Sequence, residues 1–194
     1  AAEQENETPA PVETPVRRDD LTVYLLLPAA NGSMLTQLLS TLENYQSHAT
    51  LLLTPELLES AGDGVRRAAA TGNAVALCIS AETADEALAQ IERGNDALWR
   101  AASLRTRHVY LESVDKTLRA AVVGAGYCPI TINTSDFTRS GTHWADTALK
   151  WAGRSTSVRL YLGTESGVSS ALGTALSRLR AENCTIAALN EVTA

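Results

Sequence analysis

The sequence predicts an α/β domain in which a parallel sheet is covered by helices. About seven short apolar segments alternate with about six amphipathic segments between residues 21 and 192, the pattern of repeated strand–helix–strand units. Crossovers between parallel strands are right-handed, so such a chain forms either an open doubly wound sheet or a closed barrel. The residue pattern alone leaves both architectures open.

Residues 48–80 contain the clearest of these units. Residues 49–53 form a short, bounded apolar run, which is typical of a buried parallel strand. A helix follows, because Thr54 can cap it, Pro55 suits its first position and Glu56 complements the positive end of its dipole. One face of this single helix is apolar up to its end at Gly72 and Asn73, through Leu57, Leu58, Ala61, Val65 and Ala68.

The same alternation continues before and after this unit. The remaining strands are predicted at residues 21–27, 74–79, 107–111, 128–133, 157–162 and 184–189. The remaining helices are predicted at residues 33–46, 82–102, 114–126 and 168–181, with Val114 on an inward face, and a further short helix carries Trp144, Ala148 and Trp151. Three tryptophans, Trp99, Trp144 and Trp151, have helical spacing, which favours packing in the core over stacking on a sugar.

Composition excludes several classes of protein. The 194 residues are 45% hydrophobic, enough for a sizeable core, and the net charge of -6 argues against a nucleic-acid groove. No apolar run approaches the roughly 20 residues of a membrane span. The three cysteines, Cys78, Cys128 and Cys184, are widely spaced and odd in number, which favours small buried thiols over disulfides or a zinc site.

Residues 1–20 differ from the rest of the chain. They are rich in Pro, Glu and Thr, carry six acidic and two basic residues, and lack hydrophobic periodicity. Such a segment cannot bury enough apolar surface to offset the entropy of ordering it, so we expect a flexible acidic linker before a domain at residues 21–194. A linker of this kind suggests a signal peptide or membrane anchor further upstream, and hence an extracytoplasmic domain.

Several segments of the chain resemble polysaccharide deacetylases, the NodB-homology family of carbohydrate esterases. The segment ATLLLTPELLES…GVRRAAATGNAVAL is similar to the ATFF…L…GHEIG region of that family. AAVVGAGYCPITINTSDF resembles the AGY-x-P strand with its following Asp-aromatic pair, and VSSALGTALSRLRAENCTIAALNE resembles the closing helix and strand. The resemblance implies a distorted (β/α)7 barrel of the NodB/polysaccharide deacetylase type.

The catalytic motifs of that family are missing. Its first strand ends in TFDDG, whose first Asp is the general base and whose second binds metal, whereas residues 26–30 here read LLPAA, with Ala29 in the metal-binding position. The two metal-binding histidines correspond to Cys78 and Glu82. The resemblance therefore implies that the divalent metal of the family is lost, and we predict no catalytic residue, no metal ligand and no cofactor.

The other two motifs are also replaced. The arginine-proline motif corresponds to residues 110–112, and the late Leu-His-Asp motif, whose His is the general acid, corresponds to residues 162–164. The histidines present, His48, His108 and His143, lie elsewhere, and we interpret each as a structural residue. A general base or acid must present a titratable group to the reacting atoms, and residues 26–30 and 162–164, which stand at the base and acid positions, offer none.

Polar residues still follow the predicted strands, where sites of parallel α/β proteins gather. The candidate binding residues at this barrel mouth are Asn31, Cys78, Glu82, Glu112, Asn133, Asp136 and Glu165. Helix capping and solvation are the simpler explanation for the acidic ones. A two-carboxylate glycosidase site could be drawn from Glu82, Glu112 and Glu165.

Three functional hypotheses follow. The leading one is an inactive polysaccharide deacetylase-like domain that binds glycan or peptidoglycan, or acts as a scaffold, without binding nucleic acid or inserting into a membrane. The alternative is a carbohydrate deacetylase or other hydrolase with a rebuilt site around Cys78, Glu82, Glu112 and Glu165. The third is a purely structural domain that presents partners outside the membrane. The sequence does not indicate an oligomeric state.

Overall fold

A curled parallel sheet forms the centre of the molecule in a computed structural model, which describes residues 21–163 and 168–190. The predicted linker (residues 1–20) and Glu165 lie outside the described residues. The strands are β1 (Thr22–Pro28), β2 (Thr50–Leu53), β3 (Ala74–Ile79), β4 (His108–Leu111), β5 (Cys128–Pro129), β6 (Thr134–Asp136), β7 (Ser157–Leu162) and β8 (Thr185–Ala187). They hydrogen-bond in the order β5-β4-β3-β2-β1-β7-β6, with β8 paired to β1.

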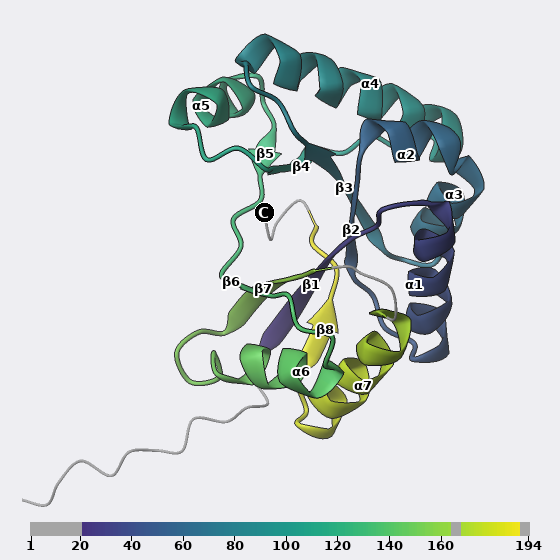
Figure 1. Cartoon of the computed structure of the whole chain (residues 1–194), viewed down its shortest axis with the longest axis vertical. Helices are drawn as coiled ribbons and strands as arrows, with labels where there is room; N and C mark the ends of the chain where they lie inside the picture. Colours follow the sequence, from purple (N-terminus) through teal and green to yellow (C-terminus); the bar gives the residue numbers. More distant parts are fainter. Residues whose placement is uncertain (1–20, 164–167, 191–194) are drawn as a thin grey trace, which may run out of the picture.

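Helices surround the outside of this sheet, as Figure 1 shows. They are α1 (Gly32–Asn44), α2 (Pro55–Ser60), α3 (Gly62–Ala70), α4 (Ala84–Ala102), α5 (Lys116–Gly124), α6 (Gly141–Leu149) and α7 (Val168–Ala181). Every strand pairing among the described residues is parallel, as strand–helix–strand units require. Strands β5 and β6 end the order, so the barrel is open between them.

Strand β1 has three partners. One edge pairs along its length with β7, from Thr22 opposite Ser157. The other edge is shared, because β8 pairs with its first half (Thr22 opposite Thr185) and β2 with its second half (Leu26 opposite Thr50). The first and last strands of the described chain therefore meet at the centre of the sheet.

The main apolar core lies between the convex face of the sheet and the helices. In β7, Val158, Leu160 and Leu162 are fully buried in this core, while the residues between them are only partly buried. A smaller apolar cluster lies on the concave, inner face of the sheet. Its buried members are Leu26, Leu52, Ala76, Cys78, Ile130 and Leu189.

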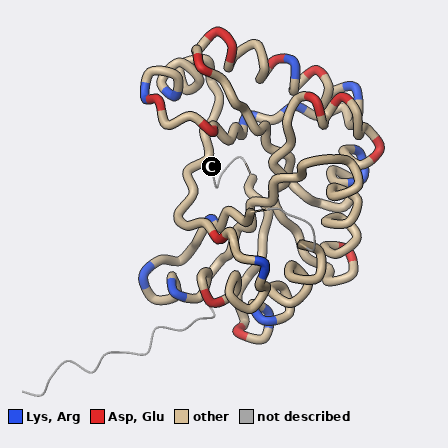
Figure 2. Tube along the Cα trace, in the orientation of Figure 1, with Lys and Arg blue, Asp and Glu red and all other residues tan. Residues whose placement is uncertain are grey.

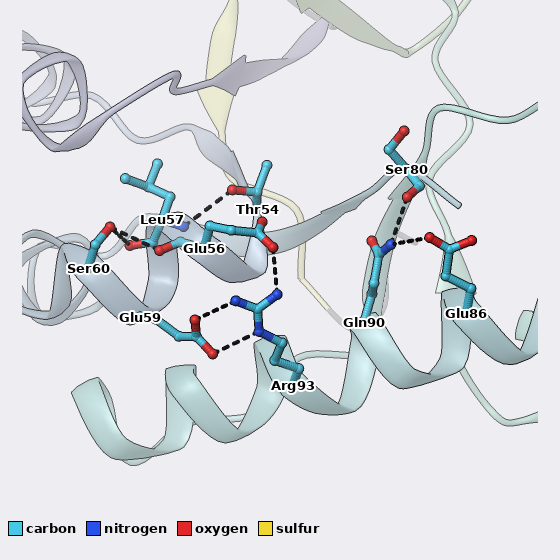
Figure 3. A network of polar contacts seen from close by, with 9 residues as sticks. All are labelled: Thr54, Glu56, Leu57, Glu59, Ser60, Ser80, Glu86, Gln90 and Arg93. Atoms are coloured by element: carbon cyan, nitrogen blue, oxygen red, sulfur yellow. Dashed lines mark hydrogen bonds and ion pairs between the residues drawn. The ribbon is translucent and has the colours of Figure 1, made fainter. Parts of the chain in front are cut away.

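Charged residues lie mainly on the outer helices, with both signs interspersed (Figure 2). Arg93 of α4 binds two carboxylates of α2, with Nη1 2.6 Å from Glu56 Oε1 and Nη2 2.6 Å from Glu59 Oε2 (Figure 3). Thr54 accepts the amide hydrogen of Leu57 at 3.3 Å and caps α2 as predicted. Helix α2 is thus fixed at its first turn and along its outer side.

The single helix predicted after Thr54 is wrong, because it breaks at Ala61 into α2 and α3. Gly62 and Gly64 follow the break, and glycine has a low helix propensity, so the backbone bends there at little additional cost. The strand predicted at residues 128–133 is also wrong. Only residues 128–129 form a strand, β5. Residues 130–133 cross the open side of the barrel, and β6 begins beyond the predicted range, at Thr134.

Two further side chains differ from the predictions. Val114 is 97% exposed instead of inward, because Asp115 caps α5 through Thr117 and Leu118 and the helix begins only at Lys116. Trp99 is 55% exposed on α4, whereas Trp144 is fully buried as predicted. Among the described residues, no helix is both long and apolar enough to cross a membrane.

Candidate functional site

The carboxyl ends of β3 and β4 bring two of the predicted site residues together. Cys78 lies opposite Tyr110 in the register, so Glu112, two residues further on, reaches the same face as Cys78. The Cys78 thiol donates a hydrogen bond to Glu112 Oε1 at 3.8 Å. Burial and the adjacent Glu112 carboxylate raise the pKa of the Cys78 thiol to about 12. The thiol is therefore protonated at neutral pH, and it is neither a nucleophile nor a metal ligand in this state.

An aromatic cluster, which we define as Tyr110, Phe137 and Tyr161, covers the concave face beside this pair. The rings of Tyr110 and Tyr161 stack with centroids 5.2 Å apart, and Phe137 tilts onto Tyr161 at 5.9 Å. Strands β4 and β7 are separated in the sheet by β3, β2 and β1, so the stack spans the curled sheet from one side to the other. Phe137 is 72% exposed and forms the outer edge of the cluster.

The position of the Phe137 ring is restricted by Gly163, which follows β7. A Cβ atom at Gly163 would lie 2.6 Å from Cδ1 of Phe137, so any larger residue there would displace the ring. Burial raises the pKa of Tyr161 to about 12, with Tyr110, Cys78 and Glu112 adding to the effect. Burial also raises the pKa of Tyr110. The two phenols thus remain neutral and present polar hydroxyl groups beside apolar ring faces.

Asp136, at the end of β6, is buried within a hydrogen-bond network. Its Oδ2 accepts from His143 Nδ1 at 2.6 Å and from the Thr147 hydroxyl at 2.8 Å, and its Oδ1 accepts from the Thr138 hydroxyl at 2.7 Å. Burial alone would raise the pKa of Asp136, but the hydrogen bonds from Thr138, Thr147 and His143 outweigh it and lower the pKa below its usual value. The carboxylate is used to fix the start of α6 to β6.

The remaining predicted residues have separate places. Asn31 caps α1 by accepting the amide hydrogen of Met34 at 2.9 Å. Asn133 accepts the amide hydrogen of Arg159 at 2.7 Å and joins the crossing segment to β7. The exposed Glu82 precedes α4, and its amide donates to Glu86 at 3.1 Å. Cys78 and Glu112 are thus the pair of predicted candidates that a hydrogen bond joins directly.

Tyr110, Phe137 and Tyr161 were not among the predicted site residues. Tyr110 carried a signal, since it alternates with Glu112 and faces the same side of β4. No sequence signal indicated the contact between Tyr110 and Tyr161, because that contact depends on how strongly the sheet curls. The pairing of Asp136 with His143 was also missed, because the turn before α6 brings the two together.

The side chains at the mouth do not fit the divalent ion that the predicted family binds. Within residues 21–163 and 168–190, no group of three His, Cys, Asp or Glu side chains is arranged to hold a metal ion. The end of β1 offers only Pro28 and the buried Ala29. Cys78 and Glu112 supply two donors at most, and the thiol holds its proton.

Comparisons with known proteins identify the fold. No protein-family model matches the chain, and no curated protein sequence matches it. A polysaccharide deacetylase from Bacillus cereus matches with a TM-score of 0.72 and 15% identity, over 89% of this chain and 94% of that one. A peptidoglycan deacetylase from Bacillus subtilis matches with a TM-score of 0.68 and 15% identity, over 87% of each chain.

A protein from Bacillus anthracis that is described as a pseudoenzyme of the CE4 family also matches, with a TM-score of 0.68 and 15% identity over 89% of this chain and 65% of that one. At these identities the likeness concerns the fold. It confirms the predicted barrel of the NodB/polysaccharide deacetylase type, and it decides between the two architectures that the strand–helix pattern left open.

Proposed function

We propose that this domain binds glycan at the barrel mouth, outside the cytoplasm, as a binding or scaffolding module without deacetylase activity. The observation that carries the proposal is the aromatic cluster of Tyr110, Phe137 and Tyr161 at the strand ends. A pyranose ring has an apolar face of C–H groups bordered by hydroxyl groups. An exposed aromatic ring with phenol hydroxyls nearby complements both parts of such a ring.

The chemistry of the same residues supports a role in binding instead of catalysis. General acid–base catalysis requires a group that exchanges its proton near neutral pH. The pKa of Cys78 and that of Tyr161 are each raised to about 12, and the Asp136 carboxylate accepts hydrogen bonds from four donors. Hydrogen bonding and stacking, in contrast, need no change of protonation.

The comparisons support the class of ligand. One structural neighbour is a peptidoglycan deacetylase and another is a pseudoenzyme, so this fold is found both in enzymes that act on glycan and in a protein classed as an inactive relative. Cell-wall glycan is therefore the ligand we propose, and an extracytoplasmic location follows from that ligand and from the linker composition of residues 1–20.

The test is titration of the domain with chitooligosaccharides and soluble peptidoglycan fragments, followed by NMR or calorimetry. The Phe137→Ala variant removes the exposed ring of the cluster, and we expect it to weaken binding about tenfold, a typical loss for a stacking residue. Trp99→Ala is the matched control, because Trp99 is also an exposed aromatic residue but lies on the outer helix α4. Equal affinity of wild type and the Phe137→Ala variant would contradict the proposal.

The second candidate is a hydrolase with a rebuilt site, which the contact between Cys78 and Glu112 favours. It predicts release of acetate from acetylated chitooligosaccharides and loss of that release in a Glu112→Gln variant. We expect no acetate from the wild-type domain, and less than one equivalent of zinc, cobalt or nickel in protein purified without chelator. Acetate release that depends on Glu112 would replace the binding proposal with this one.

A further inference from the structure

A cavity of about 380 Å³ lies on the flank of the barrel, between β5 and β7. We name it the flank cavity, and its main lining residues are Arg119, Val123, Ile130, Thr131, Arg159 and Leu189. Its size falls within the range of small-molecule sites, about 300–1,000 Å³. It is distinct from the candidate glycan site, because the described residues that line it include neither the Cys78–Glu112 pair nor any member of the aromatic cluster.

The floor of the flank cavity is apolar. Ile130 and Leu189 belong to the cluster on the concave face of the sheet and are 9% and 4% exposed. Val123 of α5 lies at the rim and is 53% exposed. A ligand with an apolar body would therefore contact hydrocarbon at the floor and remove exposed hydrocarbon from water at the rim, chiefly that of Val123.

Two arginines approach this floor from opposite sides. Arg119 comes from α5 and donates through Nη2 to the Pro129 carbonyl at 3.3 Å and to the Thr131 hydroxyl at 3.2 Å. Both of these hydrogen bonds are donated by Nη2 and orient the Arg119 guanidinium. Neither bond uses Nε or Nη1. Arg159 comes from β7, where Asn133 holds its backbone at both N–H and C=O.

The charged residues that line the cavity are all positive among those that the structure describes. The described residues that line the cavity include Arg119 and Arg159 but no Asp or Glu. Guanidinium groups match the planar oxygens of carboxylates and phosphates, and two of them over an apolar floor favour a ligand that carries both features. We propose that the flank cavity binds a small organic anion consisting of a carboxylate or phosphate on an apolar body.

Three ligands test the two parts of this proposal, the negative charge and the apolar body, separately. They are 4-phenylbutyrate, its neutral amide 4-phenylbutanamide, and inorganic phosphate, each titrated into the whole chain at matched ionic strength and followed by NMR or thermal shift. We expect 4-phenylbutyrate to bind at least about tenfold more tightly than the amide, since the amide lacks the charge. Phosphate should bind more weakly than 4-phenylbutyrate, because it lacks the apolar body. Equal binding of the acid and the amide would overturn the proposal, and phosphate binding as tightly as the acid would reduce the cavity to a simple anion site.

Variants then locate the binding. Arg119→Met should weaken the binding of 4-phenylbutyrate about tenfold. Arg154→Met, which removes an exposed arginine before β7, should leave the affinity for 4-phenylbutyrate unchanged. Because Arg119 also supports residues 129–131, Val123→Asp and Val123→Lys provide a second measurement at an exposed position. Val123→Asp should weaken the binding of 4-phenylbutyrate and Val123→Lys should strengthen it. Neither variant should change the binding of the amide. If both Val123 variants bind like the wild type, the site lies elsewhere.

Discussion

The two faces of the sheet have different roles in this molecule. The convex face is covered by helices, and its core is almost entirely aliphatic, with Trp144 as its largest fully buried side chain. The concave face has a small apolar cluster bordered by partly buried tyrosines, a thiol and a carboxylate. The convex face thus supplies most of the buried apolar area that stabilises the barrel, while the concave face carries the polar and aromatic groups of the candidate site.

Adjacent leucines on β2 allow the two faces to be compared directly. Leu53 is buried in the convex core and Leu52 in the concave cluster, at 0% and 1% exposure. We expect Leu53→Ala to lower the free energy of unfolding by about 4 kcal/mol and Leu52→Ala by about 2–3 kcal/mol, because the cost depends on how well the surroundings can fill the cavity. The tyrosines beside Leu52 are partly exposed and can move into it. Urea denaturation measures both, and an equal or larger loss for Leu52→Ala would show that the concave face stabilises the barrel as much as the convex one.

Asp136 tests whether a polar residue near the mouth can matter as much as a core leucine. Asp136→Asn places an amide donor among groups that now donate to a carboxylate, so we expect a loss of about 2 kcal/mol in the free energy of unfolding. The matched control is Asp146→Asn on α6, which removes a half-exposed ion pair with Arg178 and should cost less than about 1 kcal/mol. Similar losses for the two variants would show that the network around Asp136 contributes little.

The pH dependence of the same variant has a definite sign. The pKa of Asp136 is lower in the folded chain than its ordinary value, so the ionised form stabilises the fold. This contribution is complete above the unfolded value of about 3.9 and is lost as the pH falls through the folded value. Wild type should therefore lose stability more steeply than Asp136→Asn as the pH falls below about 4. Parallel curves in urea denaturation would contradict this assignment.

The smallest effect is expected on the outer surface. Arg93→Met removes the ion pairs between α4 and α2, but the Arg93 side chain is 46% exposed and the pairs are largely solvated. We expect Tm to fall by about 2 °C or less at low salt, and the difference to shrink in about 1 M NaCl. Arg100→Met, on the same helix, is the control for losing an exposed charge. A large, salt-independent drop would mean that α2 is held mainly by Arg93.

The sequence predicted most strands closely because they are short apolar runs, but it did not predict β6, whose residues Thr134–Asp136 are polar. The bounds of β3, β7 and α7 match their predictions residue for residue. The errors occur where local signals compete. Gly62 and Gly64 interrupt a continuous apolar stripe, and β5 ends at Pro129, where the chain leaves the sheet to cross the open side of the barrel.

The candidate site was less accessible from the sequence. Cys78 and Glu112 could be predicted because parallel strands bring their carboxyl ends to one edge. The stack of Tyr110 on Tyr161 depends on the curvature of the whole sheet, which no local pattern encodes. Trp99 was predicted to be in the core but is exposed. Helical spacing alone does not indicate how much of the surface of α4 the neighbouring elements cover.

The shared edge of β1 has a consequence for how the polypeptide acquires its structure. Two of the three neighbours of β1, β7 and β8, come from residues 157–162 and 185–187, more than 130 positions along the chain. Contacts of such large sequence separation close long loops before they gain any stabilisation, which slows folding. During synthesis on the ribosome, the hydrogen bonds of the first strand therefore cannot be complete until residues 185–187 have emerged.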